Sequence, residues 1–471
     1  MSDVVTDTSK ALVAAQGDAV ALPGEDPYQE ALATIFFSDA AMRRPSCVVQ
    51  PRTTEDVAAA MRISSEHGSQ VTVRGGGLSS LCTADDAVLI DLSAHLDTAA
   101  VAGDRVRAGG GAKVGTILEA LAPMSRVIPV GVVSLAGMGL ATRGGLGYLT
   151  RSRGPTIDSL DEVELVLPGG DTLRLSNAST GDEADLWWAV RGCAPHFGVV
   201  TSATFRSHAL GPVFAHRAIF DLDALSAFFE VAPSLPADTS LSAVLGPPVG
   251  SSEPVLFTYL VYAADDEAGM DRAAGYVREV ATRASTSPLL ELAGTYRYLD
   301  GLPPMSVPGL DGTEPGGPQP PVPGEPRAFM YSKCRFGPAT LGAGAAEAVA
   351  ERIRVAPTSF CRIDFQHTGG ALGAVADDAT AFWGRDSEWN IPWNSLWTES
   401  EGDRESCVSW ARETADALDP FAPGVYSVEL RPGFPETRAE VDAAFGGNLP
   451  RLRALKSTWD PNNVMGSYYP L

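Results

Sequence analysis

The sequence predicts an α+β protein with two domains. The chain has 471 residues, which is long enough for two separate hydrophobic cores. Over the first 208 residues, short strands are mixed with helices and glycine-rich loops. Beyond residue 209, longer strands and helices follow one another in the pattern of an antiparallel sheet backed by helices.

The first half opens with a helix that leads into a strand. Residues 54–67 begin with a Thr-Glu-Asp cap and carry apolar residues at helical spacing. Residues 70–76 then form a predicted strand that ends in glycines. The further predicted elements are strands at 87–93 and 105–115, a helix at 115–124, a glycine-rich loop at 131–154, a hairpin at 158–176, and a helix, tight turn and strand at 184–208.

The second half is predicted to form one antiparallel sheet covered by helices. Residues 301–326 are too rich in proline and glycine for a core and are predicted to form a surface loop. We expect a first domain at 1–208, a second at 209–420, and a C-terminal return to the first domain at 421–471. The elements expected here are strands at 213–222, 241–247, 255–263 and 360–367, and helices at 223–233, 266–283, 345–354 and 448–463.

Net charge and cysteine spacing argue against several function classes. A formal net charge of −23 would repel nucleic-acid phosphates. No apolar run approaches the roughly 20 residues that span a bilayer, and the N-terminus lacks a secretory pattern. We therefore expect a cytoplasmic protein with neither a membrane nor a nucleic-acid partner. Its six cysteines have no paired spacing, which predicts buried thiols and no metal site.

Three glycine-rich clusters in the first half indicate a phosphate-bearing ligand. Consecutive glycines let backbone N–H groups approach a phosphate closely and form an anion-binding concavity. Residues 137–142 do not complete the GxGxxG pattern of dinucleotide-binding domains, and no Walker pattern is present. From the residues alone, the clusters mark either a cofactor site or turns in a glycine-rich chain.

Five ordered segments resemble the berberine bridge enzyme-like FAD-linked oxidases, which have the vanillyl-alcohol oxidase and p-cresol methylhydroxylase type of flavin fold. The resemblance implies an FAD-binding domain made from the N-terminal half and the C-terminal tail. It also implies a substrate domain between them that covers the flavin ring. The segments that carry it are residues 43–80, 144–158, 185–205, 369–389 and 446–465.

The resemblance also implies cofactor-binding positions. It places a pyrophosphate loop at the first glycine cluster, a second loop after residue 131, an adenosine side near residue 199, and a tail residue near the flavin. The residues implied are Arg74, Gly75, Gly76, Gly77 and Ser79 in the first loop, Gly137, Gly139, Gly144, Gly145 and Gly147 in the second, Gly198, Val199 and Val200 beside the adenosine, and Asn448 in the tail.

Two positions depart from the family in a way that bears on flavin attachment. Leu78 stands where a histidine is commonly bonded to the flavin, and Val132 stands where a cysteine forms the second bond. Because neither side chain has a nucleophile, bound FAD is expected to be held noncovalently. Loss of the covalent bond is also expected to lower the flavin's potential and make hydride abstraction harder.

Other departures replace glycines of the family with larger residues. Each added Cβ near a phosphate or at positive φ costs on the order of 1 kcal/mol, although Arg143 could offset part of that cost by pairing with a phosphate. The sequence therefore leaves open a noncovalent FAD site and a degenerate, empty one. The positions concerned are Ala136, Met138, Arg143, Cys193, Ala194 and Pro195, with His196 in place of an asparagine.

Most catalytic and substrate-binding candidates come from the second half and the tail, and one comes from the first half. Flavin oxidation of a C–H or an alcohol needs a base with a tuned pKa. Tyr426 and Glu429 match the strand in which the family places active-site residues, and either is a candidate base. His367 could face the flavin or be a hydrogen-bonded residue of the sheet. Trp389, Trp393 and Trp397 could form an apolar substrate wall or pack in the core, and Tyr148 could face the substrate or be buried.

These features favour a flavin-dependent oxidoreductase of bacterial secondary metabolism. It would take a hydride from a bulky, largely apolar substrate, such as a natural-product intermediate, and pass electrons to molecular oxygen. A second hypothesis is a redox-neutral cyclase or lyase on the same scaffold, for example one that cyclises a polyketide, with FAD structural or absent. A third is a noncatalytic binding protein.

Overall fold

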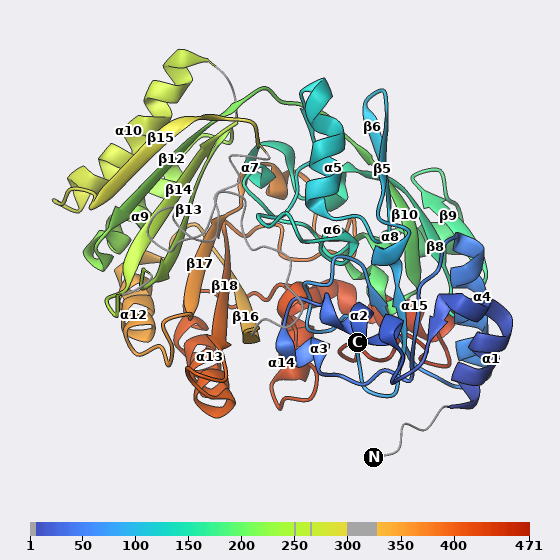
Figure 1. Ribbon diagram of the computed structural model, residues 1–471. Coiled ribbons are helices and arrows are strands. Elements are labelled where there is room, and N and C mark those ends of the chain that lie inside the picture. The colour runs from blue at the N-terminus through green and yellow to red at the C-terminus, as the bar shows by residue number, and fades with distance from the viewer. Residues whose placement is uncertain (1–5, 249–250, 264–265, 299–326) are drawn as a thin grey trace.

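The computed structural model describes residues 6–248, 251–263, 266–298 and 327–471, and it has a mixed helix and sheet architecture (Figure 1). The proline- and glycine-rich segment predicted at 301–326 lies outside the described residues. Among the described residues, a four-stranded, a five-stranded and a two-stranded sheet come from the first half of the chain, and one seven-stranded sheet comes from the second half. The two parts lie side by side, with the C-terminal helices on the side of the first half (Figure 1).

The first sheet carries the first glycine cluster at the end of one of its strands. A central strand, β4, pairs in parallel with β2 and β3. The capping box of Thr53 starts helix α4 (Thr54–Glu66), which links β2 to β3. Because β3 ends at Arg74, the glycines follow directly from a buried strand. In spatial order the strands are β1 (Val20–Ala21), β2 (Cys47–Val49), β4 (Val88–Asp91) and β3 (Val71–Arg74).

The second sheet is antiparallel throughout and contains the predicted hairpin. Residues 160–166 and 172–176 pair as β8 and β9, joined by the Pro-Gly-Gly turn. Helix α5 (Val114–Leu121) packs near β5, and α8 (Asp182–Cys193) packs near β9. In spatial order the strands are β5 (Ala99–Ala102), β6 (Arg105–Gly109), β10 (Val199–Arg206), β8 (Leu160–Val166) and β9 (Thr172–Ser176).

The seven-stranded sheet of the second half is also antiparallel throughout. Helices α9 (Leu225–Val231), α10 (Glu267–Arg283), α12 (Gly342–Arg354) and α13 (Arg404–Leu418) lie on its outer face (Figure 1). Their buried residues form one core with the sheet. The strands are, in spatial order, β15 (Leu290–Tyr296), β12 (Val213–Phe220), β14 (Val255–Tyr262), β13 (Thr239–Gly246), β17 (Arg362–His367), β18 (Trp389–Trp397) and β16 (Phe329–Gly337).

The C-terminal segment contacts the first half of the chain. Helix α15 (Leu449–Trp459) packs against α8, and the Val71 amide donates to the Val464 carbonyl at 2.8 Å. The remaining short elements are α1 (Asp7–Gln16), α2 (Asp26–Ala33), α3 (Ser38–Ala41), β7 (Arg126–Val127), α6 (Met138–Ala141), α7 (Thr150–Arg153), β11 (His208–Ala209) and α14 (Thr437–Phe445).

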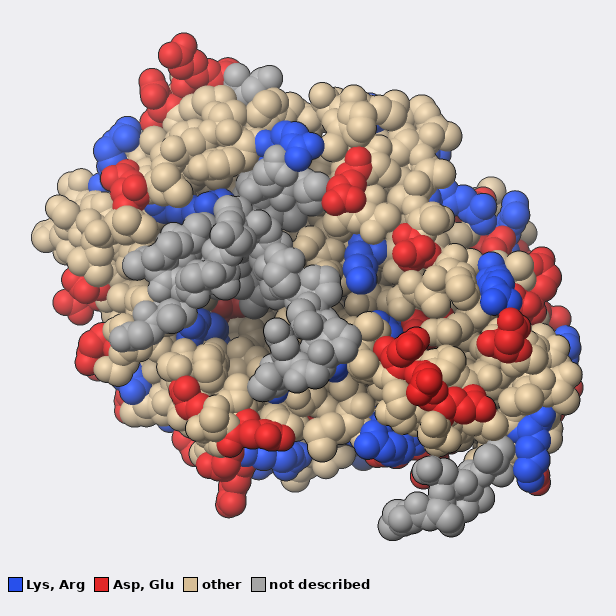
Figure 2. Space-filling model, viewed as in Figure 1, with Lys and Arg blue, Asp and Glu red and all other residues tan. Residues whose placement is uncertain are grey.

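The surface carries charges of both signs. On the face seen in Figure 2, acidic and basic side chains are interspersed, and the described residues there form no continuous basic patch of the kind that binds nucleic acid. Within the described ranges, no helix is long and apolar enough to cross a membrane.

Candidate functional site

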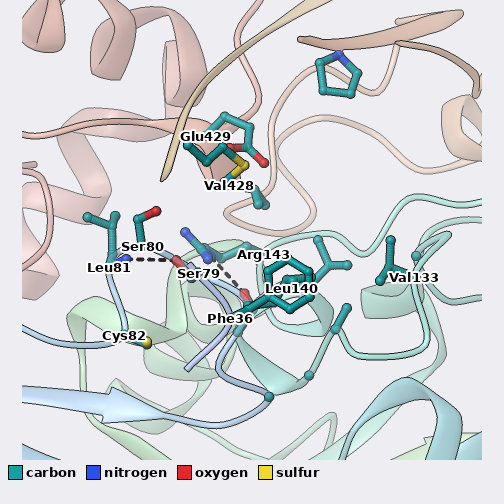
Figure 3. A pocket seen from close by; sticks show the side chains of 18 of the residues that line it. Phe36, Ser79, Ser80, Leu81, Cys82, Val133, Leu140, Arg143, Val428 and Glu429 are labelled. Atoms are coloured by element: carbon teal, nitrogen blue, oxygen red, sulfur yellow. Dashed lines mark hydrogen bonds between the residues drawn. The ribbon is translucent and has the colours of Figure 1, made fainter. Parts of the chain in front are cut away.

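A cavity of about 470 Å³ lies where the first half, the seven-stranded sheet and the C-terminal segment meet. This volume is within the range of small-molecule sites. The two glycine-rich loops, 75–82 and 131–146, form one side of the cavity, and strands β16, β17 and β18 form the opposite side. The remaining lining residues are Phe36, Phe37, Val73, Pro195, Tyr426, Val428, Glu429, Arg431 and Tyr468. Figure 3 shows Arg143 between the first loop, at Ser79 and Ser80, and Val428 and Glu429.

The two glycine-rich loops contact each other through their backbones. A Cβ on Gly76 would lie 2.4 Å from the Leu135 carbonyl oxygen, and one on Gly137 would lie 2.7 Å from the Gly76 nitrogen. Gly77 has φ +74°, a conformation that disfavours other residues. Glycine is therefore required here so that two main chains can approach each other at the edge of the cavity.

The side chain of Arg74 points away from the cavity. Its Nη1 donates to Asp91 Oδ2 at 3.1 Å and to the Ala31 carbonyl at 2.6 Å, and its Nη2 donates to Thr34 Oγ1 at 2.8 Å. Arg74 thus fixes the start of the glycine loop through a buried ion pair with Asp91. Arg74 is not part of the cavity lining, whereas Val73 and Gly75 on either side of it are.

The other residues implied as cofactor ligands divide into two groups. Those that line the cavity are Gly75, Gly76, Gly77, Leu78, Ser79, Val132, Gly137 and Gly139. Those outside the lining are Gly144, Gly145, Gly147, Gly198, Val199, Val200 and Asn448.

Residues of the second group have structural roles beside the cavity. The Gly145 amide donates to the Tyr426 hydroxyl at 2.9 Å. A Cβ on Gly147 would lie 1.8 Å from the Val130 carbonyl oxygen, and one on Gly198 would lie 2.2 Å from that of Val166. The Asn448 amide donates to the carbonyls of Asp377 and Thr380, at 2.8 Å and 3.0 Å. Asn448 therefore holds the segment 377–380 beside the C-terminal helices.

Tyr426 and Glu429 both line the cavity. The Tyr426 ring stacks on Phe336 with centroids 5.3 Å apart. Burial raises the pKa of Tyr426 well above its usual value, which works against its acting as a base near neutral pH. Glu429 accepts a hydrogen bond from Ser332 and lies 3.7 Å from Arg431. Its carboxylate is therefore already engaged by a hydroxyl and a cation.

His367 lies outside the cavity, in a polar cluster between the two parts of the molecule. Its Nδ1 accepts the Leu241 amide at 3.1 Å, so its Nε2 carries the proton and faces Glu388 Oε1 at 2.8 Å. The Arg151 guanidinium joins the same carboxylate. Burial lowers the pKa of His367 to about 4. The environment is that of a hydrogen-bonded residue of the sheet.

The tryptophans of β18 face the helices rather than the cavity. Trp389 and Trp393 are fully buried, and all three pack in the core between the sheet and its helices. Side chains alternate along a strand, so the residues between them face the other way: Asn390, Pro392, Asn394 and Leu396 line the cavity. Tyr148 packs in the core of the first half.

Sequence reasoning missed the polar residues on the cavity face of β17 and β18. Asp364 and Gln366 alternate on β17, and Asn390 and Asn394 alternate on β18. The Asn390 amide donates to Gln366 Oε1 at 2.7 Å. In the sequence around His367 and the tryptophans, polar and apolar side chains alternate with a period of two. Once the buried face of each strand was known, this alternation would have identified the polar residues on the cavity face.

Asp364 is a buried carboxyl group, and hydrogen bonds and nearby cations offset little of the cost of burying its charge. It is 7% exposed, and its Oδ1 has no hydrogen-bond partner among the described residues. Burial raises the pKa of Asp364 to about 7, and Arg362 opposes that rise only in part. A carboxyl group of this pKa can accept a proton near neutral pH.

The cavity is chemically suited to a dinucleotide. Gly75, Gly76 and Gly77 present main chain without side chains to its interior, and a Cβ on Gly139 would meet only the Arg143 guanidinium, at 3.9 Å. Exposed main chain of this kind accommodates phosphates. Within the described ranges, no group of three or more His, Cys, Asp or Glu side chains could hold a metal ion.

Comparisons with known proteins agree with this arrangement. Residues 45–176 match the family model described as an FAD binding domain, and residues 433–467 match the model described as berberine and berberine like. An uncharacterized FAD-linked oxidoreductase of Bacillus subtilis is 27% identical over 472 residues, which cover 93% of this chain and 94% of the relative. The (R)-6-hydroxynicotine oxidase of Paenarthrobacter nicotinovorans is 34% identical over 176 residues, or 36% of this chain and 37% of that enzyme.

Solved structures share the fold along nearly the whole chain. Wild-type BBE-like 1 of Physcomitrella patens superimposes with a TM-score of 0.82 at 22% identity, covering 98% of this chain and 97% of that chain. A chitooligosaccharide oxidase gives a TM-score of 0.83 at 20% identity, covering 98% and 99%.

The fold, the glycine-lined cavity and these matches define an FAD-linked oxidoreductase, and FAD is its cofactor. Within that class, the chain is similar to the berberine bridge enzyme-like oxidases, because residues 433–467 match the berberine and berberine like model and the fold is shared with BBE-like 1.

Proposed function

We propose that this enzyme oxidises a small molecule with FAD that it binds noncovalently. Leu78 and Val132 both line the cavity, and neither carries a nucleophile. FAD, when bound, supplies the hydride acceptor. The chain itself would hold the cofactor between residues 75–79 and 131–139 and exclude water from the reacting groups.

The observation that carries the proposal is the buried carboxyl of Asp364 opposite the glycine loops. With a pKa of about 7, Asp364 can take the proton of a substrate hydroxyl or amine while hydride leaves the adjacent carbon. Tyr426 and Glu429 are assigned to the cavity wall, where Tyr426 also fixes the second loop. Asp364 replaces them as the candidate base because, in the part of the chain that the structure describes, it has no cationic partner within 4 Å.

The lining supports a substrate with a largely apolar body and one or more polar groups. Met330, Pro392, Leu396 and Val428 supply apolar contacts, whereas Gln366, Asn390 and Asn394 supply hydrogen-bonding groups. A natural-product intermediate of bacterial secondary metabolism fits this description, with molecular oxygen as electron acceptor. The six free cysteines support a reducing compartment such as the cytoplasm.

We also propose that different parts of the chain bind the cofactor and the substrate. Residues 1–208 and 421–471 would hold the cofactor, and residues 209–420 would bind the substrate. All seven strands of the large sheet fall within the second range, which supports this boundary.

Two measurements on the purified protein test the proposal. Acid precipitation should release the whole visible flavin absorbance into the supernatant, whereas flavin retained in the pellet would contradict noncovalent binding. Candidate substrates added without oxygen should then bleach the flavin absorbance. Conversion of substrate with an unchanged spectrum would instead identify the redox-neutral cyclase or lyase.

A further inference from the structure

We propose that Arg143 binds the diphosphate of FAD and thereby serves as the noncovalent anchor of the cofactor. The proposal rests on the noncovalent FAD of the proposed function and goes beyond it by naming the anchoring group. Three observations support it: the burial of this cation, the absence of an anionic partner among the described residues, and its place in the cavity.

Arg143 is 4% exposed and lines the cavity. Its Nε donates to the Gly139 carbonyl at 2.8 Å. Its Nη1 is buried and has no hydrogen-bond partner among the described residues. In Figure 3 the guanidinium lies beside Ser79 and Ser80 of the first glycine loop. The guanidinium also interacts with the Tyr469 hydroxyl, so the donors that the described residues leave unused are those of Nη1.

Arg143 differs from the other buried cations of the described chain. Nearly all of these have a carboxylate within 4 Å, whereas Arg143 forms no ion pair within the described ranges. Arg217, which also has none there, lies over the Tyr296 ring at 5.5 Å. The paired cations are Arg74 with Asp91, Arg151 with Glu388, Lys333 with Glu436 and Glu440, Arg335 with Asp419 and Glu440, Arg385 with Asp158, and Arg431 with Glu429.

The titratable groups whose pKa Arg143 shifts carry no negative charge at neutral pH. Burial lowers the pKa of His196 to about 3 and raises that of Cys193 to about 12, so both are neutral. Burial also raises the pKa of the tyrosines above their usual value. The groups whose ionisation Arg143 influences are Cys193, His196, Tyr426, Tyr468 and Tyr469.

A buried cation without a counterion is costly, so a ligand anion is the natural partner. The diphosphate is the anionic part of oxidised FAD, and guanidinium groups bind phosphate oxygens through two parallel hydrogen bonds. The main chain of residues 75–79 lines the same cavity. Arg143 would thus compensate for the covalent bonds that Leu78 and Val132 cannot form.

The proposal is tested by calorimetric titration of flavin-free protein with three probes: FAD, ADP and riboflavin. ADP carries the diphosphate without the flavin, and riboflavin carries the flavin without a phosphate. The variant is Arg143→Gln, with Arg143→Lys as the conservative change. Arg174→Gln is the matched control because that arginine side chain is 70% exposed.

In Arg143→Gln, the affinities for FAD and ADP should both fall at least about tenfold, and the Lys variant should recover part of the loss. Riboflavin affinity should stay within about twofold, and the salt dependence of ADP binding should weaken. Near-ultraviolet circular dichroism checks that the variant is folded. The control should match the wild type.

Three outcomes would overturn the proposal without touching noncovalent FAD itself. Unchanged ADP affinity would show that Arg143 does not contact the diphosphate. Tighter FAD binding by the Gln variant would mean that the arginine occupies space needed by the cofactor. Unchanged FAD affinity with a raised KM would assign the cation to a substrate anion.

Discussion

Trp393 and Asn394 are neighbours on strand β18, yet their side chains lie on opposite faces of the seven-stranded sheet. The Trp393 indole N–H donates to the Ala411 carbonyl of helix α13 at 2.8 Å, and its ring is fully buried. Asn394 lines the cavity. One strand therefore separates the stabilising core from the candidate substrate surface.

This separation predicts different effects for substitutions at adjacent positions. Trp393→Phe should lower the free energy of unfolding by about 1–3 kcal/mol, because it removes buried volume and a hydrogen bond. Its KM should stay close to that of the wild type. Asn394→Ala should raise KM severalfold and change stability by no more than about 0.5 kcal/mol. Urea unfolding and steady-state kinetics check both, and a raised KM in the Trp393 variant alone would reverse the assignment of the two faces.

Asp364→Asn should reduce kcat by about a hundredfold or more, since the amide cannot accept the substrate's proton. In the wild type, kcat/KM should rise with pH and level off above about pH 7, where the carboxyl is ionised. The variant should lack that inflection. An unchanged inflection in the variant would assign the base to another residue.

Ionisation of the Asp364 carboxyl should lower the stability of the folded protein, although it favours activity. The pKa of Asp364 is raised in the folded protein, so between about pH 4 and pH 7 the folded state binds more protons than the unfolded state. Stability from this group is therefore lost as pH rises through that window. Asp364→Asn should gain stability relative to the wild type at pH 8 and gain little at pH 4. Thermal unfolding at the two pH values measures the difference, and an equal gain at both would contradict the burial argument.

The lowered pKa of His367 predicts that the contact between the two parts of the molecule weakens in acid. Its pKa is lowered to about 4 by burial, whereas the unfolded chain titrates near 6.5. As pH falls from 6.5 to 4 the unfolded state takes up a proton first, so stability declines. His367→Gln should show a smaller decline over this range in urea unfolding. The exposed His67→Gln variant is the control, and equal slopes in both variants would contradict the prediction.

The backbone contact between the glycine loops makes Gly76 and Gly137 sensitive to any side chain. Gly76→Ala should destabilise the protein by about 1–3 kcal/mol and weaken FAD binding, because its Cβ would meet the Leu135 carbonyl oxygen. Gly139→Ala places its Cβ no closer than 3.9 Å to its nearest neighbour and should leave the melting temperature unchanged. A stable Gly76→Ala protein with normal FAD affinity would show that the loops can separate without loss.

Local sequence patterns predicted much of the fold, and the resemblance predicted the cofactor. The helix at 54–66 and the hairpin at 160–176 follow from a capping box and a Pro-Gly-Gly turn. The sequence could not show which glycines face the cavity. Gly145 and Gly147, for example, lie against carbonyl and hydroxyl groups from other parts of the chain. Arg74 and His367 illustrate the same limit. The resemblance implied Arg74 as a cofactor-binding residue, and His367 could face the flavin or belong to the sheet, but the carboxylates that they contact lie 17 or more positions away in the sequence.

The return of the C-terminal segment has a consequence for how the holoenzyme is made. Tyr468 lines the cavity, and the Tyr469 carbonyl accepts the His196 ring N–H at 2.9 Å. Translation reaches these positions only after both glycine loops and the large sheet have been synthesised. A nascent chain that stops short of them lacks this part of the cavity wall, so flavin loading should be among the last events of biogenesis.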